Sequence, residues 1–149
     1  GHPMAAGLSM EEKNVELFRR RLNDNCTLTE QDLIPKIMID VPMPISYLSK
    51  KLTEQLKVLE PFGKGNSKPL FAQKNLRAVG IRVLGRNRNV AKMLLIDENG
   101  IKMDAVYFGE AQEFVDFVQA HDTISVTYYP EINVFQGREN LQVVIKNYC

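Results

Sequence analysis

The second half of the chain alternates between apolar and polar residues in the way that half-buried β-strands do. Val79, Ile81 and Val83 alternate with smaller or polar neighbours, whereas the run 90–96 is apolar on both faces, as in a strand enclosed by a barrel. The dipeptide Asn99-Gly100 is typical of a β-hairpin turn. The pattern therefore predicts strands over residues 79–83, 90–96, 101–108, 122–129 and 141–145.

A short amphipathic helix is predicted between the third and the fourth of these strands, from the helical spacing of Ala111, Phe114, Phe117 and Val118. A five-stranded Greek-key barrel with its helix in this position is the OB-fold, whose ligand face lies on strands 2 and 3 and on the loops 1–2 and 4–5. The expected fold class is thus mainly β with flanking helices: an OB-fold barrel over roughly residues 76–146, preceded by a partial α/β segment.

The first half of the chain carries helical signals. Ser9 and Glu12 match a capping box, so a helix is expected from about Met10, with an apolar face of Val15, Phe18 and Leu22. Alternation over 36–41 predicts a strand that Pro42 and Pro44 end. A second helix is predicted over 45–59, followed by a turn at 61–66. We expect three regions: residues 1–26, a strand-helix connector at residues 27–75, and the OB-fold domain at residues 76–149.

Charge is segregated along the chain although the net charge is only +1. Residues 61–96 contain no acid and carry a charge of +8, whereas residues 97–131 carry −7. Such segregation favours a basic surface that binds a polyanion. The alternative is that the two blocks lie side by side and cancel. The basic residues of the first block are Lys64, Lys68, Lys74, Arg77, Arg82, Arg86, Arg88 and Lys92.

The two loops that an OB-fold uses for oligonucleotides supply the candidate nucleic-acid-binding residues. Arg86 and Arg88 lie in the predicted loop between strands 1 and 2, and Phe135 and Arg138 in that between strands 4 and 5. Proteins that bind single strands combine cations that follow the phosphates with aromatic rings on which bases stack. The alternatives are that these arginines serve solubility and that Phe135 lies under the barrel.

Three groups of weaker candidates accompany them. Lys64 and Arg82 belong to the basic block, although Lys64 suits a solvated linker face equally well. Tyr107 and Tyr129 offer stacking surface or close a barrel end. His121 is expected to cap the short helix.

Composition argues against several functions. No apolar run is long enough for a membrane span, and no signal peptide precedes the first helix. Cys26 and Cys149 are the only cysteines, which favours a reduced, cytoplasmic protein. Two histidines and scattered carboxylates do not form a metal site for phosphodiester hydrolysis, so this chain is expected neither to hold a metal nor to cut DNA by itself.

Three segments resemble one family. The opening 1–7, Gly-His-Pro-Met-Ala-Ala-Gly, is similar to the glycine-rich DHHA1 signature of DHH phosphoesterases, without its first glycine. Residues 59–66, Leu-Glu-Pro-Phe-Gly-Lys-Gly-Asn, and residues 131–142, Glu-Ile-Asn-Val-Phe-Gln-Gly-Arg-Glu-Asn-Leu-Gln, resemble the junction and the closing hairpin of the OB domain in RecJ exonucleases.

The resemblance implies a C-terminal piece of a 5′-to-3′ exonuclease for single-stranded DNA that acts in recombination and repair with Mn²⁺ or Mg²⁺. It implies that His2 is the remnant of a motif near the substrate phosphate, that residues 1–26 end a DHHA1 domain, and that residues 76–149 bind single-stranded DNA. The other expected partners are the missing DHH and DHHA1 domains. Two alternatives stay open: a protein-docking or spacer module, and a piece of a nucleotide phosphodiesterase.

Overall fold

The computed structural model describes residues 4–149, so the expectation for His2 lies outside the described residues. The chain divides into two compact units, residues 1–37 and residues 38–149. Among the described residues no helix is both long and apolar enough to cross a membrane.

The first unit contains the expected helix, but its start differs from the prediction. A 3₁₀ turn over Glu12–Asn14 leads into α1, Val15–Asp24, and no side chain caps either element. The predicted capping box at Ser9 is therefore wrong; a capping box occurs instead at Thr29, before the 3₁₀ turn Glu30–Leu33. None of the α1 side chains is buried. The expected apolar face thus exists as a pattern without a core beneath it.

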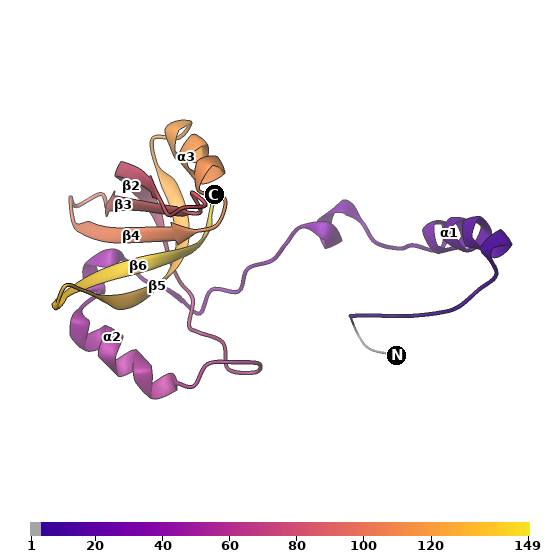
Figure 1. Cartoon of the computed structure of the whole chain (residues 1–149), viewed down its shortest axis with the longest axis horizontal. Helices are drawn as coiled ribbons and strands as arrows, with labels where there is room; N and C mark the ends of the chain where they lie inside the picture. The colour runs from indigo at the N-terminus through magenta and orange to yellow at the C-terminus, as the bar shows by residue number, and fades with distance from the viewer. Residues whose placement is uncertain (1–3) are drawn as a thin grey trace. The chain divides into compact units, whose positions relative to one another are not determined.

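The second unit contains six strands and two α-helices. A single sheet follows the order β1-β2-β3-β4-β6-β5, and an additional pairing of β2 with β5 closes it into a ring (Figure 1). The bounds are β1 Val41–Pro42, α2 Lys50–Leu56, β2 Phe71–Leu84, β3 Val90–Ile96, β4 Lys102–Phe108, α3 Ala111–Gln119, β5 Ile124–Phe135 and β6 Arg138–Tyr148.

This topology confirms the predicted OB barrel. β4 and β6 pair in parallel, while β2, β3 and β4 form an antiparallel meander. α3 connects β4 to β5, as expected, and lies against β2 and β3, whereas α2 lies against β5 (Figure 1). The predicted Asn99-Gly100 turn joins β3 to β4, with Gly100 at φ +78°.

Two upstream elements differ from the prediction. The strand expected over 36–41 is reduced to the two residues of β1, which include Pro42 and pair in parallel with the start of β2. The helix expected over 45–59 is interrupted because Leu48 is extended. Ser49 then begins α2 by accepting a hydrogen bond from the amide of Leu52, at 3.1 Å.

The barrel core draws on residues before position 76. Ile45 and Phe71 are buried with Leu76 in the same apolar cluster. The side-chain oxygen of Gln73 accepts a hydrogen bond from the amide of Ile45 at 2.6 Å, which fixes the segment before α2 to β2. The structural barrel therefore begins at Phe71, within the region expected to be a connector.

β2 contains a bulge that changes which residues face the core. Val79 pairs with Leu94, and Arg82 pairs with Lys92, so β2 has one residue more than β3 between these pairs. Gly80 lies at this point with φ +63°, a conformation that glycine adopts readily. The predicted common face of Val79, Ile81 and Val83 is therefore wrong at Val79, which is exposed, while Ile81 and Val83 pack on the core.

Replacing Gly80 with alanine is expected to lower the free energy of unfolding by about 1–2 kcal/mol, because a Cβ disfavours the left-handed conformation. No atom lies within 4 Å of the added Cβ, so the effect is one of backbone strain rather than of a clash. Gly63→Ala is the control, since Gly63 has equal space and no positive φ. Urea titrations of both variants would measure their unfolding midpoints. Equal midpoints would contradict the backbone strain expected on replacing Gly80.

Candidate nucleic-acid interface

The outer surface of β2, β3 and β4, which we call the three-strand face, is organised in rows of cross-strand partners. Successive side chains of a strand point to opposite sides. Since Ala91, Met93 and Leu95 are buried in the core, their neighbours on β3 point outward. The rows across the face are Leu84–Val90–Phe108, Arg82–Lys92–Val106, Val79–Leu94–Asp104 and Arg77–Ile96–Lys102.

The Gly80 bulge decides the composition of this face. If β2 continued from the Val79–Leu94 pair without a bulge, Ile81 would lie opposite Lys92 and Arg82 would point inward. With it, the Arg82 guanidinium and the Lys92 ammonium group lie on the same side of neighbouring strands. The bulge thus produces two adjacent cations in the second row.

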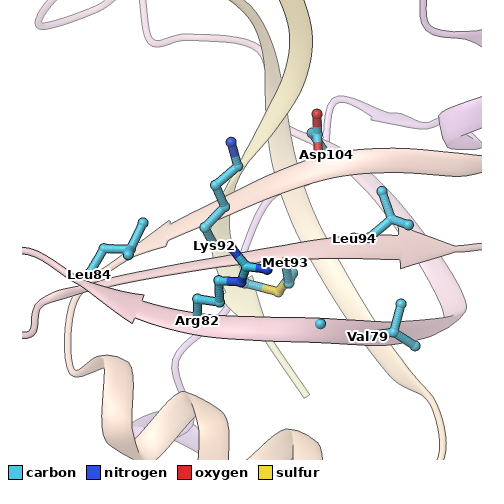
Figure 2. A pocket seen from close by; sticks show the side chains of 8 residues that line it. Val79, Arg82, Leu84, Lys92, Met93, Leu94 and Asp104 are labelled. Atoms are coloured by element: carbon cyan, nitrogen blue, oxygen red, sulfur yellow. The ribbon is translucent and has the colours of Figure 1, made fainter.

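A hollow of about 330 Å³ opens on the three-strand face (Figure 2). Figure 2 shows the Arg82 side chain extending from β2, while Lys92 and Asp104 project from β3 and β4. Among residues 4–149, the ion pairs involve none of these three charged side chains. The lining residues are Val79, Gly80, Arg82, Leu84, Lys92, Met93, Leu94 and Asp104.

The turn between β2 and β3 carries the first pair of expected arginines. Arg86 is exposed, and Arg88 adopts φ +51°. The Arg88 guanidinium donates a 3.4 Å hydrogen bond to the side-chain oxygen of Gln112, whose amide group in turn donates to Asp116 at 2.9 Å. Arg88 is therefore connected to the acidic helix α3, so this cation lies beside part of the acidic block.

The tip between β5 and β6 carries the second pair. It is a two-residue turn rather than a loop, because β5 continues to Phe135 and β6 begins at Arg138. The turn residues Gln136 and Gly137 both have positive φ, as a type I′ hairpin requires. Phe135 is 65% exposed, so its ring does not lie under the barrel.

The strand register places the two loops at opposite ends of the face. Val90 pairs with Phe108, which brings the β2–β3 turn to the C-terminal end of β4. Gln142 pairs with Asp104 near the N-terminal end of β4, and the hairpin tip lies four residues before it on β6. Of the predicted site residues, Arg82 lies on the face itself, while the loop residues flank it.

Sequence reasoning missed Lys92, Asp104 and Phe108 as site residues. Phe108 is 58% exposed at the end of the apolar first row, where an aromatic face is open to solvent. Outward-facing residues could have been assigned from the period-2 alternation of β3 and β4. Their grouping with Arg82 could not, because it depends on the bulge.

The remaining candidates have structural contacts. Tyr107 stacks on Phe114, with ring centroids 4.8 Å apart. Tyr129 is only 7% exposed and lies under the Lys68 ammonium group, 4.7 Å from its ring centroid. Burial raises the pKa of Tyr129, and the negative charges of Glu60 and Glu131 raise it further.

Lys64 and His121 lie away from the hollow. Lys64 is exposed in a turn closed by the Gly63–Asn66 bridge. Nδ1 of His121 is 2.7 Å from the carbonyl oxygen of Phe117 in the last turn of α3, which confirms the expected capping contact. Within the described part of the chain, no three His, Cys, Asp or Glu side chains are grouped so that they could hold a metal ion.

Comparison with known proteins adds a family match. The model of the RecJ OB domain matches residues 39–147. The single-stranded-DNA-specific exonuclease RecJ of Bacillus subtilis is 31% identical over 149 residues, which cover 99% of this chain and 19% of the relative. RecJ of Escherichia coli is 29% identical over 153 residues, which cover 99% of this chain and 25% of the relative. The chain thus spans 19% and 25% of the length of these two relatives.

Solved structures agree in fold. A crystal structure of RecJ from Thermus thermophilus in complex with Mn²⁺ matches with a TM-score of 0.69 at 21% identity, covering 100% of this chain and 21% of that one. A second structure of that protein, in complex with Mg²⁺, matches with a TM-score of 0.62. At this level of identity the likeness concerns the fold.

Proposed function

The chain belongs to the RecJ OB domain family, and from this premise we propose that it binds single-stranded DNA on the three-strand face. The observation that carries the proposal is the adjacent pair Arg82 and Lys92, two cations without an ion-pair partner within residues 4–149. Cations held next to each other on a rigid sheet form a binding site for consecutive phosphates.

Apolar side chains beside these cations support single strands as the ligand. The first row lies two residues along each strand, or about 7 Å, from the second row, which contains Arg82 and Lys92. The exposed ring of Phe108 belongs to this first row. Unpaired bases stack on aromatic and apolar surfaces, whereas a duplex keeps its bases inside. We place Arg86 and Arg88 at one margin of the track, and Phe135 and Arg138 at the other.

The wider role is part of the same proposal. The chain would be the C-terminal region of a 5′-to-3′ exonuclease specific for single-stranded DNA, acting in recombination and repair in the cytoplasm. Residues 1–26 would end the DHHA1 domain, and the catalytic DHH domain with its Mn²⁺ or Mg²⁺ would lie elsewhere in the protein. Lys64 would extend the basic track, and this chain by itself would bind DNA without cutting it.

The experiment that tests binding compares a fluorescent single strand with its duplex. We expect tighter binding of the single strand, with log affinity falling by about 0.7 per phosphate contact as log salt rises, or roughly −1.4 for Arg82 and Lys92 alone. Fluorescence anisotropy at several salt concentrations measures both quantities. Binding of neither ligand at low salt would overturn the proposal.

The alternative is a protein-docking or spacer module. It is favoured by the β5–β6 tip, where Val134 and Phe135 are both exposed. Fold alone does not decide between the two functions, because OB barrels serve both. Absence of DNA binding at low salt would favour docking.

A further inference from the structure

Asp104 is an acid on an otherwise basic surface. It lies on β4 between Leu94 and Gln142 of the neighbouring strands, and it lines the hollow together with Arg82 and Lys92. The other charged residues that line the hollow are these two cations. A carboxylate here repels the phosphates that the cations attract, so its presence on a DNA-binding face needs a separate reason.

The usual structural roles do not account for Asp104. It makes none of the ion pairs found within residues 4–149, so it neutralises neither cation at contact distance. Its cross-strand neighbour Gln142 donates instead to Glu131, at 2.6 Å. None of the side-chain hydrogen bonds found among residues 4–149 involves the Asp104 carboxylate. Its oxygens are therefore free to accept a hydrogen bond from a ligand in the hollow.

The hollow has the features of a binding site for a single base. Gly80, which lines the hollow, has no side chain, and an added Cβ would meet no atom within 4 Å, so the space at Gly80 is open. Val79 and Leu94, paired across β2 and β3, present apolar groups next to this space. A volume of about 330 Å³ is at the lower end of the range for small-molecule sites, which suits a heterocyclic base.

We propose that the Asp104 carboxylate accepts a hydrogen bond from the exocyclic amino group of a base seated in this hollow. Carboxylates pair with the cytosine N4 amino group, a donor, whereas thymine and uracil present an acceptor at that position. An acceptor facing Asp104 leaves both groups without a hydrogen bond, which is unfavourable. The face therefore prefers amino-bearing bases, and this inference rests on the proposed binding of single-stranded DNA.

The test compares oligo-deoxycytidine with oligo-deoxyuridine, each roughly 12 nucleotides long, within the length that one OB-fold covers. The two differ in the group at position 4 and in the adjoining ring proton, and neither carries the thymine methyl group. Slightly alkaline buffer keeps cytosine from pairing with itself. We expect oligo-deoxycytidine to bind roughly tenfold more tightly, within the range that base contacts give.

Two variants assign the preference to a residue. Asp104→Asn removes the charge but keeps the shape, and its amide can either donate or accept. We expect the cytosine-to-uracil affinity ratio to fall close to one, while both affinities rise because an anion is lost. Glu113→Gln on α3 is the matched control: it removes the same charge from a residue that does not line the hollow. The ratio of the wild-type chain should persist in it.

The outcomes separate this inference from the function on which it rests. Equal affinities for the two oligonucleotides, with salt-dependent binding intact, would overturn the role of Asp104 and leave single-strand binding standing. A cytosine preference that survives in Asp104→Asn would also overturn it. If neither oligonucleotide binds, the proposed function fails, and the inference fails with it.

Discussion

Replacing Phe114 with alanine is expected to lower the free energy of unfolding of the barrel by about 3–5 kcal/mol. Phe114 is fully buried, and its ring packs against Tyr107 and Tyr148, with centroid distances of 4.8 Å to each. Truncation removes these contacts and leaves a cavity that the rigid sheet cannot fill. α3 would then lose the largest of its buried side chains.

Tyrosine signals make this measurement specific to the second unit. The chain has no tryptophan, and its five tyrosines all lie after residue 37. Denaturant titration followed by near-ultraviolet circular dichroism therefore reports on the barrel. Phe108→Ala is the matched control, because the same truncation at an exposed ring should change stability little. A Phe114→Ala midpoint equal to that of the control would show that α3 does not support the barrel.

The double substitution Arg82→Ala/Lys92→Ala is expected to weaken single-strand binding by roughly 60-fold at 50 mM salt. Each of the two phosphate contacts contributes about 0.7 to the slope of log affinity against log salt. The slope should become less steep by about 1.4, and the difference from the wild-type chain should nearly vanish toward 1 M salt. The physical reason is that each neutralised phosphate releases a condensed counterion. Anisotropy titrations with one oligonucleotide over a salt series measure both effects.

A second double variant controls for net charge. Lys51→Ala/Lys57→Ala also removes two cations, one from α2 and one from the 3₁₀ turn after it. Because these residues do not line the hollow, the slope should stay close to that of the wild-type chain. Equal losses in the two variants would mean that DNA responds to overall charge, and the three-strand face would lose its assigned role.

The sequence determined the order of the barrel elements. Period-2 alternation, the Asn99-Gly100 turn and the helical spacing over 111–118 are local signals, and each corresponds to an element of the structure. Because an OB-fold is specified by that order, local pattern was enough to identify the fold. The same local reading failed for 36–41 and 45–59, where pairing with β2 and packing on the barrel decided the conformation.

The composition of the candidate site was decided by tertiary structure. Alternation alone put Val79, Ile81 and Val83 on one face, and only the pairing of β2 with β3 reveals the extra residue at Gly80. Because of this bulge, Val79 and Arg82 both point outward, and Arg82 lies beside Lys92. Likewise, Asp104 lines the same hollow as the two cations only because β4 pairs with β3 in this register. A shift of one residue in strand pairing exchanges the two faces of a strand, and pairing between distant segments is not written in the pattern of either one.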